Sequence, residues 1–594
     1  MVIPALLLIL LLATPVYLDE INIATKIQIS LNEFIKTGVK TKNLTDAVQL
    51  LKALPNGEYG HEQYCQTCKY VVDGVLQQRR SGAQKDSMAK LITELCMIFS
   101  GVNEIGCAGR VDREIDALLY IIDNKGNLTS DRVCGIFLQH YGCTDPNYQE
   151  WHVNIPERTD TAFVQPEPSG QSLKILHLTD IHFDPEYEPG SNAACEDPLC
   201  CRGGTPDKPE NAAGYWGDYR VCDMPWHSVL NLMDQVKQQH KQIDFVYYTG
   251  DVVSHISWMT TRESNLNDIG RLFELFLQRF NSTYVYPILG NHEAHPSNYF
   301  SPKNISEPLS TQWLYDYVAD DWSKWLPEDT KTTIRNGGFY TVLVRKGFRV
   351  IGVNSNLCYT DNFWLFFNDV DPQGQLQWLA DTLAEAEKNG EIVHLLSHVP
   401  PGSLECWHPW SDEFTRIINR FSHIVRAQFN GHTHTDEIRV FLNDKKDNAI
   451  TVAYNGASFT TFIGNNPNYR VYDMDSKSFE ITDYEEWIFN LTEANKDRDT
   501  PPNWYKLYSF KDAYGLNSTR NEDLFDWIQR MENDPNKELL KQYFRFLKRD
   551  SGVETFGSCD GDCLDSLLCF IVSLSYEDAL KCYKSSSSTR LIFS

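Results

Sequence analysis

The sequence predicts a mixed α/β domain that lies between two helical, cysteine-rich regions. Five apolar stretches with the composition of strands each run directly into a residue that can bind a metal, and helical patterns alternate with them between residues 173 and 475. Six cysteines gather before this domain, in residues 61–147, and four more follow it, in residues 559–582. An apolar strand needs cover on one or both faces, and its carboxyl end is where an α/β sheet presents ligands.

Length and composition limit the possibilities further. At 594 residues the chain is longer than one hydrophobic core usually serves, so two or three domains are expected. Its 42% hydrophobic and 12% aromatic content is typical of a globular protein. The formal net charge of −26 argues against a nucleic-acid partner, because no basic stretch is available to neutralise phosphates.

Several features predict the secretory route. Residues 1–17 have the pattern of a signal peptide without a basic start, with an apolar run at Val2–Leu12 and turn-prone residues around Ala13–Pro15. Later apolar runs such as Leu567–Leu574 are far too short to span a membrane. Sixteen cysteines, an even number, suit an oxidising compartment. Six sequons are candidate glycosylation sites: Asn43, Asn127, Asn281, Asn304, Asn490 and Asn517.

The first cysteine group lies among amphipathic helical patterns such as Tyr70–Gln78 and Met88–Ser100. Six cysteines permit fifteen pairings, so spacing alone leaves their connectivity open. A zinc site at Cys65-x-x-Cys68 is disfavoured because no second pair has finger-like spacing. A C-x-x-C pair, one cysteine per helix and a closing pair resemble a saposin-type domain at residues 61–147. That resemblance implies the bridges Cys65–Cys143, Cys68–Cys134 and Cys96–Cys107.

Saposin-type domains expose apolar helix faces to lipid, so the resemblance implies a lipid substrate. The alternative is a structural cap that packs on its neighbour. Residues 148–172, rich in Pro, polar and small residues, are expected to form a semi-rigid linker.

The remaining chain divides into two regions. The α/β domain occupies residues 173–475, with helical patterns at Met224–Gln238, Ile269–Phe280 and Gln373–Lys388. Beyond Tyr484 the pattern becomes helical and charged. Residues 484–590 are therefore expected to form a C-terminal helical subdomain stapled by disulfides.

The strand-like stretches end in candidate ligands. They are Leu173–Asp180, Ile243–Asp251, Tyr284–His292, Glu391–His398 and Ile424–His434. A lone histidine is more often part of a core, but these histidines lie beside Gly, Asn, Asp and Pro, where the backbone turns tightly. The candidate metal ligands are Asp180, His182, Asp251, Asn291, His398, His432 and His434. The five strand ends, taken together, predict a binuclear metal site. Carboxylates mixed with imidazoles suit zinc, manganese or iron rather than calcium.

The series D-x-H, G-D, G-N-H-E, H and G-H-x-H resembles the calcineurin-like metallophosphoesterases over about half of the chain. The resemblance implies a four-layer fold, a two-sheet sandwich flanked by helices, with the site at the strand ends. Its implied ligand sets are Asp180, His182, Asp251 and His434 for one metal, and Asp251, Asn291, His398 and His432 for the other. Asp251 would bridge the two metals.

The implied chemistry is the hydrolysis of a phosphate ester. Two cations about 3.5–4 Å apart can lower the pKa of a shared water, and the resulting hydroxide attacks phosphorus in line with the leaving alkoxide. A general acid would assist that alkoxide, and His292 and His255 are the candidates because neither is needed as a ligand. Purple acid phosphatases place a tyrosine ligand of iron three residues after the bridging Asp, where this chain has Ser254. Two zinc ions are therefore expected.

The order of regions resembles the acid sphingomyelinase family over nearly the whole chain. Supporting segments are the cysteine group Cys195, Cys200, Cys201 and Cys222, and the stretch from Asn455 to Pro467. The resemblance implies the bridges Cys195–Cys200, Cys201–Cys222, Cys358–Cys406, Cys559–Cys563 and Cys569–Cys582. With the three saposin-type bridges, all sixteen cysteines are then used.

The resemblance to the acid sphingomyelinase family implies a secreted and/or lysosomal enzyme that hydrolyses sphingomyelin to ceramide and phosphocholine. Its partner would be sphingomyelin in membrane or lipoprotein surfaces, reached by peripheral contact through the saposin-type domain. The apolar segment Asn362–Phe367 either contacts lipid or is buried, and its periodicity does not decide between the two. The rival functions are a secreted phosphodiesterase of nucleotides or other small phosphoesters, and a non-catalytic lipid-binding protein.

Overall fold

The computed structural model describes residues 23–54, 58–158, 165–443, 445–552, 559–573 and 575–585. The chain divides into two compact units, Met1–Gln149 and Glu150–Ser594. The signal-peptide-like segment at residues 1–17 lies outside the described residues. Within the described ranges, every helix is too short or too polar to cross a bilayer.

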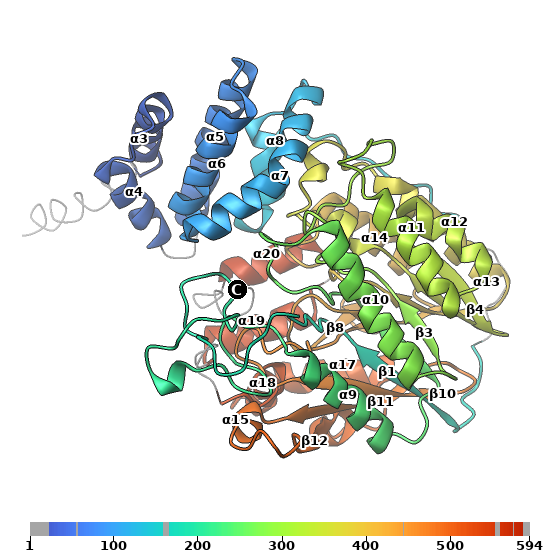
Figure 1. Ribbon diagram of the computed structural model, residues 1–594. Helices are drawn as coiled ribbons and strands as arrows, with labels where there is room; N and C mark the ends of the chain where they lie inside the picture. The colour runs from blue at the N-terminus through green and yellow to red at the C-terminus, as the bar shows by residue number, and fades with distance from the viewer. Residues whose placement is uncertain are drawn as a thin grey trace, which may run out of the picture. The chain divides into compact units, whose positions relative to one another are not determined.

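The first unit is helical. Its helices are α3 Ile23–Thr37, α4 Lys42–Lys52, α5 Glu58–Arg80, α6 Lys85–Ser100, α7 Glu104–Asn124, α8 Ser130–Phe137 and the short 3-10 helix η1 Gln139–Tyr141 (Figure 1). Three disulfides connect them: Cys65–Cys143, Cys68–Cys134 and Cys96–Cys107. These are the pairs that the saposin resemblance implies. They join α5 to α8 and to the segment beyond it, and α6 to α7.

Helices α3 and α4 precede the predicted start of this region at residue 61. Ile27, Leu31 and Phe34 lie on one face of α3 and are buried together with Leu44 of α4 and Leu95 of α6. Apolar residues at this spacing form the buried stripe of an amphipathic helix. The compact helical unit therefore begins before the cysteines that predicted it.

The second unit contains two six-stranded mixed sheets. The first has the order β12-β11-β10-β1-β2-β3 and the second β4-β5-β6-β7-β9-β8. Strands β1–β3 run parallel to one another, as do β5, β6, β7 and β9. The strands are β1 Ser172–Leu178, β2 Phe245–Tyr248, β3 Tyr284–Pro287, β4 Tyr340–Arg345, β5 Phe348–Gly352, β6 Ile392–Leu396, β7 Val425–Asn430, β8 Glu437–Leu442, β9 Ala449–Asn455, β10 Asn468–Asp475, β11 Ile481–Phe489 and β12 Trp504–Ser509.

Helices lie along both sheets of this unit (Figure 1). Those before residue 485 are α9 Trp226–Gln239, α10 Arg262–Arg279, α11 Gln312–Asp321, α12 Lys331–Gly337, α13 Gln375–Lys388 and α14 His408–Phe421. Those after it are α15 Leu491–Ala494, α16 Phe510–Tyr514, α17 Asn521–Glu532, α18 Glu538–Leu547, α19 Asp562–Ile571 and α20 Tyr576–Ser585. The 3-10 helices are η2 Pro209–Asn211, η3 Trp322–Lys324, η4 Glu328–Thr330, η5 Ser355–Cys358, η6 Phe363–Phe366 and η7 Pro372–Gly374.

The two sheets pack face to face between layers of helices. Tyr247 of β2 points inward, where its ring lies 4.9 Å from that of Phe429 on β7. The next residue, Tyr248, points outward and contacts Phe273 and Phe276 of α10. In the second sheet, Val393 and Leu395 of β6 pack in the cluster formed with α13 and α14. The predicted four-layer sandwich is therefore confirmed.

The prediction of a helical region from residue 484 onward is wrong for its first part. Strands β11 and β12 extend the first sheet beyond β10 as far as Ser509. The charges in β11 misled the prediction because Glu486 is buried, where its Oε2 accepts a hydrogen bond of 2.8 Å from Arg470 Nε. Helices α16–α20 follow, and the disulfides Cys559–Cys563 and Cys569–Cys582 lie among them.

Two further segments are packed against their neighbours. In η6, the side chains of Trp364, Leu365 and Phe366 are buried, which agrees with the buried alternative for this segment. The first part of the expected linker is fixed against α14, where Val153 N donates to Glu413 Oε2 at 3.0 Å. Val153 is buried among the apolar residues of α13 and α14, so this stretch is not a free spacer.

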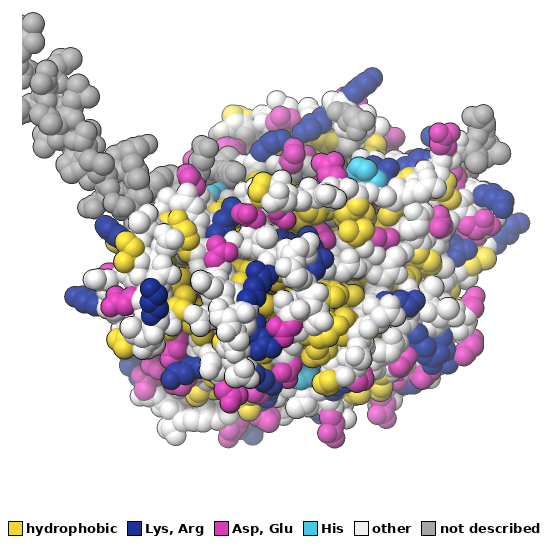
Figure 2. Space-filling view, turned by 90° about the horizontal axis from the view of Figure 1, so that it is seen from above, with side chains coloured by type: hydrophobic (Ala, Val, Ile, Leu, Met, Phe, Trp, Pro, Cys, Tyr) yellow, Lys and Arg dark blue, Asp and Glu magenta, His cyan; other side chains and the backbone are white. Residues whose placement is uncertain are grey.

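All sixteen cysteines are paired. The remaining bridges of the second unit are Cys195–Cys200, Cys201–Cys222 and Cys358–Cys406. These pairs, and the two in the C-terminal helices, are the ones that the family resemblance implies. Figure 2 shows acidic and basic side chains interspersed over the face that it presents.

Candidate metal centre

The seven candidate ligands lie just beyond the carboxyl ends of β1, β2, β3, β6 and β7. Asp180 follows β1, Asp251 follows β2, and His398 follows β6. All three side chains are buried. The carboxyl ends of parallel strands meet along one rim, so stretches far apart in the sequence bring their ligands together.

A first cluster forms around His182. Its Nε2 lies 3.2 Å from Nε2 of His434 and 3.4 Å from Oδ2 of Asp251. His434 Nε2 lies 3.4 Å from Oδ1 of Asp180. Two ring nitrogens this close need a proton or a cation between them, because their lone pairs would otherwise repel.

A second cluster shares one atom with the first. Oδ2 of Asp251 also lies 3.1 Å from His398 Nε2. Asn291 Oδ1 is 2.9 Å from His398 Nε2 and 2.9 Å from His432 Nδ1. The structure therefore brings all seven predicted ligands into two adjoining groups with Asp251 between them.

Backbone carbonyls fix three of the four histidine rings. The Nδ1 atom lies 2.6 Å from Val253 O in His182, 2.6 Å from Thr249 O in His398 and 2.9 Å from Phe462 O in His434. A carbonyl can only accept, so each Nδ1 carries the hydrogen and each Nε2 is left to face the cluster. Metal-binding histidines are commonly held in this way.

Five of the candidate ligands have strained backbone. The φ angles are positive at Asp180 (48°), His182 (35°), Asp251 (62°), His432 (74°) and His434 (55°). Each such residue costs on the order of 1–3 kcal/mol and persists only where its surroundings hold it. Hydrogen bonds between these residues stabilise part of this backbone conformation, since His432 N donates to Asp180 Oδ1 at 3.0 Å.

Two glycines of the motifs allow the chain to come close. A Cβ on Gly290 would lie 2.1 Å from Asp251 Oδ1, and one on Gly431 would lie 2.2 Å from Thr179 Oγ1. These are clashes that no side chain can relieve easily. The glycine before Asn291 and the glycine before His432 are therefore required by space.

The electrostatics of the centre call for positive charge. Burial raises the pKa of Asp251, but the neighbouring His398 and His292 outweigh burial and hold that pKa well below its usual range. Burial lowers the pKa of His398, yet Asp251 and Asp180 raise it to about 9. Two buried carboxylates thus draw protons onto imidazoles. Divalent cations can take the place of those protons, so the donor set fits a pair of metal ions.

His292 and His255 border the first cluster. The His292 ring lies 4.9 Å from that of His182 and 4.7 Å from that of His255. Among the described residues, His292 Nδ1 has no hydrogen-bond partner although it is buried. Burial lowers the pKa of His292 to about 4, so this imidazole is neutral near pH 7.

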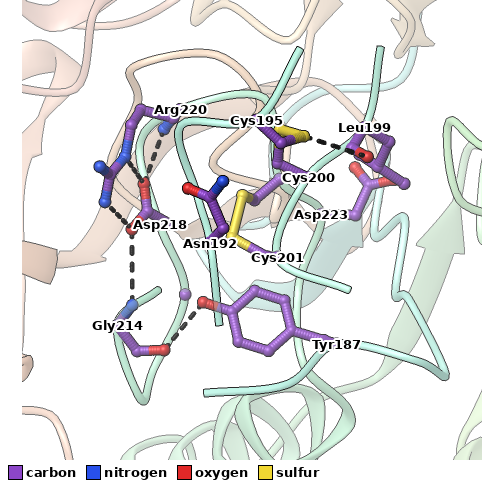
Figure 3. The surroundings of a disulfide bond; sticks show 12 residues. Tyr187, Asn192, Cys195, Leu199, Cys200, Cys201, Gly214, Asp218, Arg220 and Asp223 are labelled. Carbon is purple, nitrogen blue, oxygen red and sulfur yellow. Dashed lines mark hydrogen bonds and ion pairs between the residues drawn. A yellow bond between two sulfur atoms is a disulfide. The ribbon is translucent and has the colours of Figure 1, made fainter. Parts of the chain in front are cut away.

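Sequence reasoning missed the partner of His255. Asp223 Oδ1 lies 2.7 Å from His255 Nδ1, and Oδ2 accepts the backbone N–H of His255 at 2.6 Å. Asp223 directly follows Cys222, whose bridge to Cys201 closes the cysteine-rich loop beside the site. Figure 3 shows Cys201 and Asp223 in this loop. The cysteine spacing was the available signal, but it does not reveal which polar residue the bridge places.

Two further supports were also missed. Glu293, the last residue of the G-N-H-E motif, accepts the backbone N–H of Asp251 at 3.0 Å and that of Val252 at 2.6 Å. Arg549, which follows α18, is fully buried and donates from Nη2 to His434 O at 3.1 Å. The C-terminal region therefore holds the loop of the candidate ligand His434.

Comparisons with known proteins agree with this arrangement. A family model described as calcineurin-like phosphoesterase matches residues 173–436. A second, described as the acid sphingomyelin phosphodiesterase C-terminal region, matches residues 448–589.

Relatives extend the similarity over most of the chain. The sphingomyelin phosphodiesterase of Bos taurus is 34% identical over 528 residues, which cover 87% of this chain and 83% of that protein. Sphingomyelin phosphodiesterase 1 of Caenorhabditis elegans is 32% identical, covering 88% and 94%. The cyclic GMP-AMP phosphodiesterase SMPDL3A of Rattus norvegicus is 30% identical, covering 69% and 92%. The chain therefore belongs to the sphingomyelin phosphodiesterase family, metal-dependent hydrolases with a calcineurin-like phosphoesterase domain.

Proposed function

We propose that this protein hydrolyses sphingomyelin to ceramide and phosphocholine at a centre that holds two zinc ions. The observation that carries the proposal is the convergence of seven ligand side chains on two groups that share Asp251 Oδ2. The bovine and nematode relatives, which match most of the chain, are both named for sphingomyelin and support this substrate.

We assign the ligands by the two groups of contacts. One metal would be held by Asp180, His182, Asp251 and His434, and the other by Asp251, Asn291, His398 and His432. When bound, two such cations lower the pKa of a water molecule and neutralise charge on phosphoryl oxygens. Mixed imidazole and carboxylate donors suit zinc. Ser254, at the place where purple acid phosphatases carry a tyrosine ligand of iron, supports zinc over a redox-active metal.

Either His292 or His255 supplies the single proton for the departing ceramide alkoxide. Both border the first cluster, and His292 presents a buried ring nitrogen that is not used within the described residues. An anionic phosphodiester beside these rings raises their pKa and so favours the protonated form that can donate. Asp223 holds His255 with its Nε2 directed away from the carboxylate. We assign the contact with the transition state to His292.

The substrate lies in membrane or lipoprotein surfaces, so the protein must reach an interface. We assign that peripheral contact to the saposin-type region, residues 61–147. An exposed apolar side chain in it, Ile105 at 62%, supports this role. Eight disulfides and the relatives' identity support a secreted or lysosomal location. The sequons add to this, since Asn43, Asn127, Asn281, Asn304 and Asn517 are exposed and Asn490 is half-buried.

The experiment is phosphocholine release from sphingomyelin vesicles at acidic and neutral pH, with and without a chelator. We expect release that the chelator abolishes and added zinc restores. Release that is insensitive to the chelator would overturn the metal mechanism. A nucleotide substrate assayed in parallel tests the rival function, for which the similarity to the rat cyclic GMP-AMP phosphodiesterase is the supporting observation. Turnover of the nucleotide without phosphocholine release would favour that rival.

A further inference from the structure

His432 differs from the other three ligand histidines in the way its ring is turned. In His182, His398 and His434 the Nδ1 atom faces a backbone carbonyl and Nε2 faces the metal centre. In His432 the order is reversed. Its Nδ1 lies 2.9 Å from Asn291 Oδ1, inside the second cluster, and its Nε2 points outward.

The outward nitrogen of His432 meets a carboxylate. Oε2 of Glu405 lies 3.3 Å from His432 Nε2. The other three histidines take neutral carbonyl partners at the corresponding atom, so Glu405 is the charged member of the set. A carboxylate behind a metal-binding imidazole fixes its tautomer and orientation and increases the basicity of the nitrogen that faces the metal.

The backbone around Glu405 is fixed at both ends. Its carbonyl accepts the N–H of Thr360 at 2.8 Å, and the next residue, Cys406, is bonded to Cys358. Trp407 N donates to Cys358 O at 2.6 Å. The disulfide therefore joins two short segments that run antiparallel beside the site.

The opposite segment also contacts His432. The ring of Tyr359, adjacent to Cys358, meets the His432 ring edge to face, with centroids 4.9 Å apart at 78°. The residue before Glu405, Leu404, is buried with Phe570 and Tyr576 of the C-terminal helices α19 and α20. The backbone of Glu405 is thus held by the packing of Leu404 on one side and by the Cys358–Cys406 disulfide on the other. The Glu405 side chain itself is 38% exposed.

We propose that Glu405 is a positioning residue for His432, an inference that rests on the proposed dimetal function. Its carboxylate holds the imidazole with Nε2–H outward and Nδ1 toward Asn291 Oδ1, where the second metal would bind. The segment pair closed by Cys358–Cys406 sets the place of Glu405 and of Tyr359 together. Glu405 makes no covalent step and is not assigned a contact with the substrate.

The test compares metal affinity in the full-length protein with Glu405→Ala and Glu405→Gln. Zinc dissociation is measured by competition with a chromogenic chelator, and thermal unfolding of the chelated protein is followed in parallel. We expect Glu405→Ala to bind one of the two zinc ions roughly 10–100-fold more weakly, the usual effect of losing such a partner. Glu405→Gln, which keeps the shape and an acceptor oxygen but not the charge, should fall between. The unfolding temperature of the chelated protein should not change.

Asp412→Asn is the matched control. Asp412 is also a partly exposed carboxylate beside a histidine, 3.6 Å from His408 Nδ1, on α14. It should leave both zinc affinities at the wild-type value.

Three outcomes would overturn the inference. The first is identical competition curves for the wild type and Glu405→Ala. The second is a raised KM for choline-bearing substrates with unchanged zinc affinity, which would make Glu405 a substrate contact. The third is a wild-type protein that binds no zinc, which would also remove the proposed function. The first two leave phosphocholine release by the wild type intact, so the failures can be told apart.

Discussion

The carboxylate of Asp223 makes two contacts with His255. Its Oδ1 lies 2.7 Å from the ring Nδ1, and its Oδ2 accepts the backbone N–H at 2.6 Å. Asp223 itself is fully buried, and Thr460 Oγ1 donates to its Oδ1 at 3.2 Å. The pair has the arrangement in which a carboxylate selects the tautomer of a catalytic imidazole. It leaves the second ring nitrogen of His255 for the site.

Replacing Asp223 with Asn should therefore reduce turnover without removing metal. Asparagine keeps the shape but can present an N–H to the ring, which favours the wrong tautomer. We expect kcat to fall by roughly 10²–10⁴-fold, the usual contribution of acid–base catalysis. Steady-state kinetics and metal analysis measure the two quantities. Wild-type kcat in Asp223→Asn would remove the role given to this pair.

His292→Ala should have a similar effect for a different reason. The substitution removes the ring whose Nδ1 has no partner among the described residues. A fall in kcat of roughly 10²–10⁴-fold with both metals retained is expected. His240→Ala is the control, because His240 lies at the end of α9, where its Nε2 is 3.1 Å from Tyr469 Oη. Unchanged turnover in His292→Ala would refute the assignment.

Arg470 should be a major determinant of stability. Its guanidinium is buried between Asp436 and Glu486, and burial raises the pKa of Glu486 to about 8. Replacing Arg470 with Met leaves these carboxylates buried without their partner, at a cost of about 3–5 kcal/mol.

Denaturant unfolding measures that loss, with Arg545→Met as the control, because Arg545 is 57% exposed. The control should stay within about 0.5 kcal/mol of the wild type. Adding Glu486→Gln to Arg470→Met should restore part of the stability. Equal stability of the two single variants would contradict the prediction.

Asp268 predicts a pH dependence of stability. Burial raises its pKa to about 7, against the opposing charge of Arg271, whereas an unfolded aspartate titrates near pH 3.9. Between these values the folded protein holds a proton that the unfolded chain has lost. The contribution of Asp268 to the free energy of unfolding therefore falls as pH rises from about 4 to about 7.

Asp268→Asn removes that loss. At pH 7.5 its free energy of unfolding should exceed that of the wild type by on the order of 1–3 kcal/mol, seen as a higher unfolding temperature. The difference should disappear near pH 4. Asp316→Asn is the control, because Asp316 is 53% exposed. An advantage for Asp268→Asn that is constant from pH 4 to 7.5 would show that the effect is not one of ionisation.

The strand ends were predictable because each apolar run stops at a polar residue that is costly to bury without a purpose. Asp180, Asp251 and His398 all follow predicted strands that the structure contains. The geometry at those ends was not predictable. Positive φ at Asp180 and Asp251 depends on contacts between separate stretches of chain, and periodicity within one stretch does not report such contacts.

The same limit explains the supports that were missed. Asp223 and Glu405 lie in irregular loops, next to Cys222 and Cys406, and their partners are far away in the sequence. For β11 the reason is different, because a buried Glu486 made a strand look like a solvated helix.

The place of β11, β12 and Arg549 sets a limit on proteolytic maturation. A cut after β10 would strip two strands from the first sheet and leave β10 with a bare row of amides, open to pairing with another chain. It would also take away the guanidinium that supports the loop of His434. Any trimming of the carboxyl end that preserves an active enzyme therefore has to stop downstream of residue 549.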